Sequence, residues 1–203
     1  MKLYRAPFST NVERVALALA HKGLEVESVW IDYGDRAPVE AVSGQGLVPV
    51  LVDGDEVVHD SPRILAWLEE RHPDPPLYPR EDPRRAEVET FVDWFNAVWK
   101  VWPNAIEAEL GKPAPDREAI AGHAGHMRSA LDHFERMLAG REHLMGDDFG
   151  VADCIAFPFL KFAAGRPEGD DELFHRILEE HQSVEGRPRL RDWIARVDAR
   201  PRV

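Results

Sequence analysis

The sequence predicts a chain of two domains, an α/β domain followed by an all-helical domain. Residues 1–71 mix short β-branched runs with helical stretches, whereas residues 84–203 show helical periodicity almost throughout. Between them, residues 72–83 hold five prolines in twelve residues, and proline both fixes φ and blocks helix continuation. We therefore expect a first domain over residues 1–76, a stiff linker, and a second domain over residues 84–203.

The first half begins with a predicted strand, helix and strand. Lys2–Arg5 is expected to be a short strand. Apolar residues then recur at helical spacing over residues 12–20, and Gly23 suits the position just past the end of that helix. Residues 25–31, EVESVWI, alternate between polar and apolar and predict a second strand. Residues 35–46 fit either a short helix or a loop with two glycines.

Two further strands and a helix complete the first half. Residues 48–52 and 56–59 flank Asp53-Gly54, a dipeptide that favours a tight hairpin turn. Ser61-Pro62 then opens a helix, because serine suits the N-cap and proline the first helical position. The resulting order, β-α-β-(α)-β-β-α with a final antiparallel hairpin, is that of a thioredoxin-like domain.

The second half combines amphipathic stretches with one aromatic stripe. The stretches lie near residues 84–110, 116–139, 151–164, 171–182 and 188–199. The first stretch carries four large aromatic residues: Trp94, Phe95, Trp99 and Trp102. Such a stripe is more often a helix-bundle core or a subunit interface than the wall of a ligand site, although one helix can serve both roles.

Composition excludes several classes of function. The 203 residues carry a formal net charge of -12, from 25 basic and 37 acidic side chains, so phosphate backbones and anionic lipids would repel the chain. No apolar run approaches a membrane span, and the N-terminus lacks the apolar stretch of a signal peptide, so we expect a cytoplasmic protein without nucleic-acid or membrane partners. The single cysteine, Cys154, excludes an internal disulfide and any multi-cysteine metal site.

Three histidines on one predicted helix are the remaining metal candidates. His123, His126 and His133 lie at i, i+3 and i+10, but no neighbouring carboxylate completes a recognisable metal motif. We therefore expect them on a solvated or packed helix face, and we expect no metal and no bound cofactor.

The junction of the first strand and helix, Pro7-Phe8-Ser9-Thr10-Asn11, is the first candidate for chemistry. A hydroxyl at a helix N-terminus lies near unpaired backbone N–H groups and the positive end of the helix dipole. Such a position stabilises an anion, including a bound thiolate. The alternative is that Ser9 or Thr10 only caps the helix, and taken alone this alternative is favoured.

Two further positions could hold a peptide-like ligand. Pro49 at a strand start cannot donate to the sheet, and a cis bond after Val48 would leave the Val48 backbone free to pair with a peptide-like ligand. Asp60 and Ser61 directly precede a helix, where a carboxylate, a hydroxyl and free amides together suit an amino-acid group. The alternatives are a strand-initiating proline and an ordinary N-cap.

Asp153 has a structural interpretation. It lies three residues after Gly150 at a predicted helix start, where its carboxylate can return to the backbone N–H of the cap residue. This arrangement serves folding, not catalysis.

Taken in order, these features resemble the cytosolic glutathione transferase family, with a bacterial, serine-type active site. The resemblance covers essentially the whole chain. It is most specific in four segments: NVERVALALAHKGLEVE (11–27), GLVPVLVDG (46–54), DSPRILAWLEE (60–70) and GVADCIAFPFL (150–160). It implies the glutathione transferase fold, a homodimer with the tryptophan-bearing helix near the two-fold axis, and glutathione as co-substrate.

The resemblance also implies residue roles in the glutathione site. Ser9 matches the serine whose hydroxyl donates to the glutathione thiolate, with Thr10 and Asn11 as rival positions. Val48 and Pro49 match the backbone partner of the cysteinyl unit and the cis-proline of the family. Asp60 and Ser61 match the acidic–serine pair that holds the γ-glutamyl amino and carboxylate groups.

Two departures and one further pocket complete the expected site. Gly46 and Leu47 stand where many members carry a polar or basic side chain for the glycyl carboxylate, and Gln45 or Arg36 could replace it. Gly150 stands where the family usually has serine or threonine. The acceptor pocket is expected between the domains, lined by Phe8 and by aromatic residues of the 88–102 helix such as Trp94 and Trp99.

Three functions fit this sequence. The leading one is an enzyme that activates the glutathione thiol and conjugates it to a small hydrophobic electrophile. The second is another glutathione-dependent reaction, such as isomerisation, dehalogenation or peroxide reduction; disulfide exchange is disfavoured because positions 9–12 hold no cysteine. The third is a thiol-binding or interaction protein of the same fold without turnover.

Overall fold

The computed structural model describes residues 1–203, which form two compact units. The first unit contains Met1–Asp82 together with Arg200–Val203, and the second contains Pro83–Ala199. The proline-rich segment therefore belongs to the first unit as far as Asp82. No helix combines the length and the apolar character that a membrane span requires.

A mixed four-stranded sheet forms the centre of the first unit. Its strands are β1 (Lys2–Arg5), β2 (Glu27–Trp30), β3 (Val50–Asp53) and β4 (Glu56–His59), in the order β2-β1-β3-β4. β1 runs parallel to β2 and antiparallel to β3, and β3 and β4 form the predicted hairpin. Gly54 in its turn has φ 59°, a conformation that glycine adopts without a Cβ clash.

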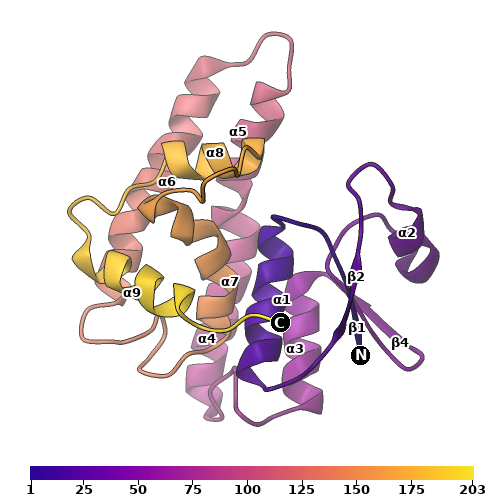
Figure 1. The fold of residues 1–203 in the computed structure, drawn as a ribbon. Helices are drawn as coiled ribbons and strands as arrows, with labels where there is room; N and C mark the ends of the chain where they lie inside the picture. The colour runs from indigo at the N-terminus through magenta and orange to yellow at the C-terminus, as the bar shows by residue number, and fades with distance from the viewer. The chain divides into compact units, whose positions relative to one another are not determined.

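Three helices flank this sheet: α1 (Thr10–His21), α2 (Ala37–Ser43) and α3 (Ser61–Arg71). α1 and α3 pack against each other, and α2 lies apart from them, on the other side of the sheet (Figure 1). The ambiguous segment 35–46 is thus a short helix, which Gly44 ends with φ 71°. This arrangement confirms the thioredoxin-like fold of the first half.

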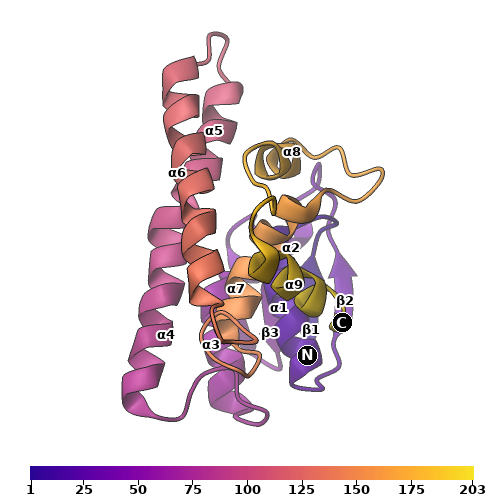
Figure 2. The same cartoon turned by 90° about the vertical axis from the view of Figure 1, so that its left-hand side faces the viewer.

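The second unit is all-helical, as predicted. Its segments are α4 (Asp82–Trp94), η1 (Phe95–Trp99), α5 (Val101–Leu110), α6 (Arg117–Met137), α7 (Val151–Leu160), η2 (Lys161–Ala164), α8 (Leu173–Glu180) and α9 (Pro188–Asp198). α5 and α6 run side by side as a long pair (Figure 2). Every residue of α7 is buried, and α7 contacts η2 and α9.

The predicted stretch 84–110 is not one regular helix. It widens into a π-helical turn at η1, where Lys100 N donates to Phe95 O at 2.9 Å. Within this turn the rings of Phe95 and Trp99 stack at 4.6 Å, and both residues are fully buried. These two members of the aromatic stripe therefore belong to the helical core.

A buried ion pair holds the start of the proline-rich segment against α1 and α3. Lys22 Nζ lies 2.7 Å from Glu69 Oε2 and also donates to the carbonyls of His72 (2.6 Å) and Pro75 (3.0 Å). Glu69 in turn accepts from the backbone N–H of Leu77 at 2.9 Å. The side chains of Lys22 and Glu69 thus pair with backbone groups of the proline-rich segment that have no partner within the segment itself.

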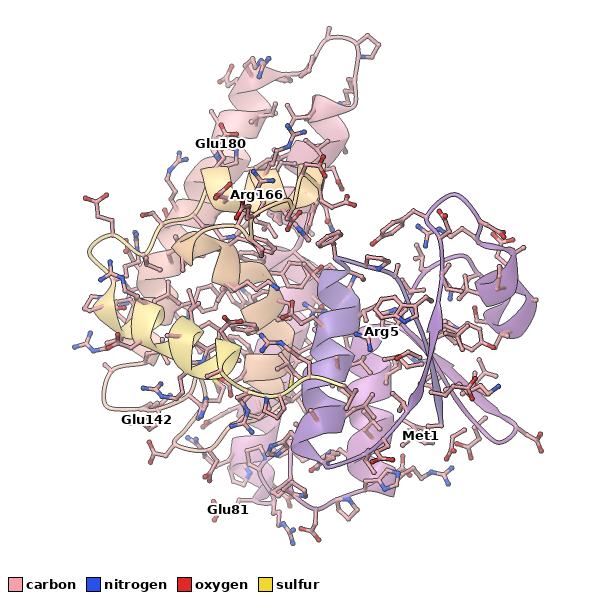
Figure 3. The ribbon with its side chains drawn as sticks, in the orientation of Figure 1. Met1, Arg5, Glu81, Glu142, Arg166 and Glu180 are labelled. Carbon is pink, nitrogen blue, oxygen red and sulfur yellow. The ribbon has the colours of Figure 1, made fainter.

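Residues 200–203 return to the first unit. Arg202 pairs with Glu13 of α1 at 3.1 Å, Arg5 Nη1 donates to the carbonyl oxygen of Val203 at 2.7 Å, and Arg200 Nη2 lies 3.0 Å from His21 Nδ1. Figure 3 shows Arg5 at the sheet, where its guanidinium also stacks over the Trp30 ring at 4.7 Å.

The surroundings of His21 predict that acid destabilises the first unit. Arginine only donates, so His21 Nδ1 accepts from Arg200 and Nε2 donates to the Pro76 carbonyl at 3.2 Å, which fixes a neutral imidazole. Burial lowers the pKa of His21; Arg200 and Lys22 lower it further, while the bond to Pro76 and the charge of Glu69 oppose this. The folded state thus favours neutral His21. The stability that His21 contributes is therefore present above its ordinary pKa of 6.5 and is lost as pH falls through the lowered pKa of the folded state.

We expect His21→Gln to weaken the acid sensitivity of folding. Urea unfolding of both proteins at about pH 7.5 and about pH 5.0 measures the effect as the drop in unfolding free energy between the two values. The drop should be smaller in the variant. An equal drop in the two proteins would show that His21 does not contribute.

Candidate glutathione site

Ser9 caps α1 and keeps a hydroxyl proton to donate. Its Oγ accepts from Val12 N at 3.3 Å, and its carbonyl accepts from Glu13 N at 3.0 Å. A hydroxyl that accepts one hydrogen bond still has its own proton for a second partner. Phe8, directly before it, has φ 59° and is 55% exposed. The cap and the predicted thiolate donor are thus compatible roles of one side chain.

The rival positions differ from Ser9 in exposure. Thr10 is buried at 8% exposure, whereas Ser9 and Asn11 are half-buried. Ser9 and Asn11 are therefore the more accessible of the three predicted sulfur partners. The choice between them stays a prediction.

The loop before β3 has the geometry expected for a peptide-binding edge. The Val48–Pro49 bond is cis, Pro49 is buried, and Val48 is half-buried directly before the strand. The side-chain amide of Gln45 closes this loop, because its Oε1 accepts from Leu47 N at 2.6 Å and its Nε2 donates to Leu47 O at 2.9 Å. Gln45 thus holds the loop backbone.

Arg36 lies beside the same loop. A Cβ on Gly46 would stand 3.1 Å from Glu40 Oε1 and 3.5 Å from Arg36 Cβ, and the Arg36 guanidinium lies 4.6 Å over the Tyr33 ring. The Gln45 amide is engaged with the loop backbone, and the choice between Gln45 and Arg36 as the partner of a carboxylate stays a prediction.

Asp60 is the N-cap of α3 and is backbone-strained. It has φ 72° and ψ 118°, its side chain makes no capping hydrogen bond, and it is exposed. Positive φ outside glycine disfavours folding and tends to occur where ligands bind. The prediction that Ser61 is the N-cap was wrong: Ser61 is the first helical residue, because the Asp60 carbonyl accepts the first intrahelical bond, from Ile64 N at 3.0 Å.

Ser61 contacts Arg14, a residue that the sequence analysis did not single out. Arg14 of α1 is fully buried, and its Nη1 donates to Ser61 Oγ at 3.2 Å. A charged residue in a predicted helix is ordinarily assigned to the solvent face. The signal that could have found it is the nearly continuous apolar run around it, since a helix that is apolar on all sides is buried on all sides.

The residues predicted for the acceptor pocket lie in different environments. Phe8 is exposed in the first unit. In the second unit Trp94 is half-buried, with its ring 5.9 Å from that of His133, whereas Trp99 is buried in the core. The pocket itself stays a prediction, and Trp94 is the better candidate of the two tryptophans.

Asp153 has the predicted folding role. Its Oδ2 accepts from Gly150 N at 3.0 Å, and its Oδ1 accepts from Trp193 Nε1 at 2.7 Å and from Leu144 N at 3.2 Å. One buried carboxylate thereby fixes the start of α7, a side chain of α9 and the preceding loop. The half of the capping box that serine or threonine would supply is absent, because Gly150 has no side chain.

Comparison with known proteins identifies the family. The glutathione S-transferase N-terminal domain matches residues 3–76, and the glutathione S-transferase C-terminal domain matches residues 117–196. "Glutathione S-transferase Z1" of Arabidopsis thaliana is 41% identical over 96% of this chain and 91% of its own length. "Maleylacetoacetate isomerase" of Pseudomonas aeruginosa is 34% identical over 82% of each chain.

A solved structure of a similar protein has the same fold as this chain. The holo structure of maleyl pyruvate isomerase, described as a bacterial zeta-class glutathione S-transferase, has a TM-score of 0.73 and 26% identity. The match covers 97% of this chain and 91% of that one. The protein is therefore a member of the glutathione S-transferase family, whose enzymes depend on glutathione.

Proposed function

We propose that the first unit binds glutathione and stabilises its thiolate at the N-terminus of α1. The observation that carries this proposal is the position of Ser9, whose hydroxyl caps the helix and retains a proton for the sulfur. The helix dipole acts in the same direction, because it favours negative charge at this end. Free thiol is mostly protonated at neutral pH, so both effects increase the fraction of the nucleophilic form.

The rest of the tripeptide would extend along the neighbouring loops. The Val48 backbone would pair with the cysteinyl unit, and Arg36 would attract the glycyl carboxylate. Asp60 would accept from the γ-glutamyl ammonium, while the start of α3 at Ser61 would receive the γ-glutamyl carboxylate. Support for the Asp60 role comes from its strained backbone and from a side chain not used in capping.

We expect Asp60→Ala to weaken glutathione binding by about thirtyfold, or about 2 kcal/mol, because the ligand ammonium loses its charged partner in a partly desolvated site. Isothermal calorimetry measures the affinity. Asp60→Asn is the matched control for backbone strain, since asparagine also tolerates positive φ but lacks the charge. An Asp60→Ala variant that binds like the parent but melts much lower would limit Asp60 to a structural role.

The reaction that we propose first is cis–trans isomerisation of an unsaturated acid that carries a maleyl group. The thiolate adds to one carbon of the cis double bond, and the electron pair moves onto the adjacent carbonyl as an enolate. The former double bond is then single and rotates. When the enolate collapses, the C–S bond breaks and the trans double bond forms, so glutathione is regenerated. Support comes from the two similar proteins described as isomerases of maleyl compounds.

Conjugation to a small hydrophobic electrophile is the second candidate. It begins with the same thiolate but ends with the C–S bond intact, so each turnover consumes one glutathione. Two observations favour it: the 41% identical relative is described as a glutathione S-transferase, and the exposed Phe8 ring stands next to Ser9. A homodimer and a cytoplasmic location, both typical of the family, are part of the same proposal.

Substoichiometric glutathione distinguishes the two reactions. The purified protein would be given maleylpyruvate in large excess over glutathione, with product followed by absorbance and free thiol by titration. Isomerisation predicts many product molecules per glutathione and a constant thiol titre, whereas conjugation of an aryl halide predicts loss of one thiol per product. Retention on immobilised glutathione with neither reaction would favour a binding protein and overturn the enzymatic proposal.

A further inference from the structure

Tyr33 holds the turn that leads into Ser9. β1 and β2 are parallel neighbours in which Arg5 is the register partner of Trp30, so the segments that follow them leave the sheet at the same edge. Pro7 lies two residues after β1 and Tyr33 lies three residues after β2. The Tyr33 hydroxyl donates to the Pro7 carbonyl at 2.9 Å. Neither the sequence pattern nor the site described above gives this contact a role.

The turn has a residue that is unusual for its conformation. Pro7 and Phe8 are its two central residues, and Phe8 has φ 59°. Proline at the second position and positive φ at the third are the pattern of a type II turn, in which the third residue is normally glycine or asparagine. Turning over the central peptide plane gives a type I turn, in which residue 8 returns to the negative φ that phenylalanine prefers. The observed turn therefore needs a contact that holds this plane.

The hydrogen bond from Tyr33 acts directly on that plane. The Pro7 carbonyl and the Phe8 N–H belong to one rigid trans peptide unit, so they point in opposite directions. With the carbonyl oxygen fixed at the Tyr33 hydroxyl, the N–H is held on the other side. Turning the plane over would break this bond and put an oxygen in place of the N–H, one residue before Ser9. Near a thiolate, an N–H favours the charged form and a carbonyl oxygen disfavours it.

The loop that carries Tyr33 is braced by its own contacts. Gly34 N donates to Asp32 Oδ1 at 2.7 Å, and Asp35 N donates to Asp32 O at 3.1 Å. The Arg36 guanidinium lies over the Tyr33 ring at 4.6 Å. Tyr33 thus donates from a fixed position although it is 46% exposed.

We propose that Tyr33 is a positioning residue for the thiolate site. By binding the Pro7 carbonyl it keeps the turn before Ser9 in its strained form, with the carbonyl oxygen at Tyr33 and the Phe8 N–H turned the other way. This is the form of the turn that, together with the Ser9 hydroxyl, stabilises the glutathione thiolate. The inference rests on the glutathione site proposed above.

The test is Tyr33→Phe, which removes the hydroxyl and keeps the ring. The turned-over form then becomes populated, so kcat near neutral pH should fall by about 2- to 10-fold, the range for losing one neutral hydrogen bond. The pKa of bound glutathione should rise, as measured by the ultraviolet absorbance of the thiolate. The loss in kcat should disappear at alkaline pH, where the bound thiol is ionised in both proteins. The KM for glutathione should change little, because the contacts proposed for the rest of the tripeptide are intact.

Two controls separate positioning from a general effect of losing a hydroxyl. Tyr4→Phe removes a hydroxyl from a half-buried residue of β1 in the same unit and should leave the bound-thiol pKa and kcat at the parent values. Glycine at position 8 accepts positive φ without help, so Tyr33→Phe should raise the bound-thiol pKa less in a Phe8→Gly protein than in the parent. This pKa is measured without an electrophile, so the proposed place of Phe8 in the acceptor pocket does not affect it.

The outcomes distinguish this inference from the function on which it rests. A parent protein that does not bind glutathione would overturn both proposals. A parent that binds glutathione, with the same bound-thiol pKa in Tyr33→Phe, would overturn only the role of Tyr33. Equal rises in that pKa in the parent and Phe8→Gly backgrounds, or an equal rise in Tyr4→Phe, would also overturn it. A raised pKa in Tyr33→Phe with little change in the ligand-free Tm, and a smaller rise in the Phe8→Gly background, would support it.

Discussion

Ser9→Ala is expected to lower kcat by about 10- to 1000-fold, the range for losing one donor to an anion in an active site. The pKa of bound glutathione should rise, which ultraviolet absorbance of the thiolate measures as a function of pH. Glutathione affinity should change little, because Val48, Asp60 and Ser61 hold the rest of the tripeptide in the proposed site.

Two controls separate catalysis from capping. Ser9 also caps α1, and losing a cap to alanine costs about 1 kcal/mol, whereas glycine is tolerated to within a few tenths. Ser9→Gly should therefore keep stability and still lose activity. Asn11→Ala tests the rival donor: full activity in Ser9→Ala with loss in Asn11→Ala would transfer the role to Asn11. Full activity in both would leave Thr10 and the backbone amides.

Lys22→Met is expected to cause the largest loss of stability in the first unit, about 3–5 kcal/mol, because it leaves a buried carboxylate without its cation. Lys22 has a fully buried side chain paired with Glu69 at 2.7 Å. The variant also removes the donor to the carbonyls of His72 and Pro75. Urea unfolding monitored by far-ultraviolet circular dichroism measures the change.

The matched control is the same substitution at an exposed pair. Lys2 and Glu27 lie 3.5 Å apart with side chains 51% and 64% exposed, so Lys2→Met should cost less than about 1 kcal/mol. Equal losses in Lys2→Met and Lys22→Met would show that burial of the Lys22 pair adds nothing to stability.

Local signals in the sequence were sufficient for most of the fold and for the outline of the site. Asp53-Gly54 predicted the hairpin and Gly23 the end of α1, because turn and cap chemistry act within a few residues. The placement of Pro49 at the start of a strand was also predictable, because proline cannot donate a hydrogen bond within a sheet. The widened turn at Phe95–Trp99 was not, since apolar spacing does not distinguish a π-turn from an α-turn.

The contacts that the sequence did not predict join residues that are far apart in the chain. Arg14 with Ser61 and Lys22 with Glu69 are each 47 residues apart, and no periodicity links their members. The N-cap of α3 was misassigned for a related reason. Serine favours N-cap positions generally, but the backbone at Asp60 turns to φ 72° one residue earlier, where the preceding strand ends.

The return of residues 200–203 to the first unit has a consequence for how the chain folds during synthesis. Residues 1–82 are synthesised first and already contain the whole sheet, yet the partners of Arg5, Glu13 and His21 are made only after the intervening Pro83–Ala199. The contact between Arg5 and Val203 spans 198 positions, so loop closure delays it until the intervening helices exist. A nascent first unit therefore passes through a period in which α1, the helix that Ser9 caps, lacks part of its contacts, and residues 200–203 complete its packing.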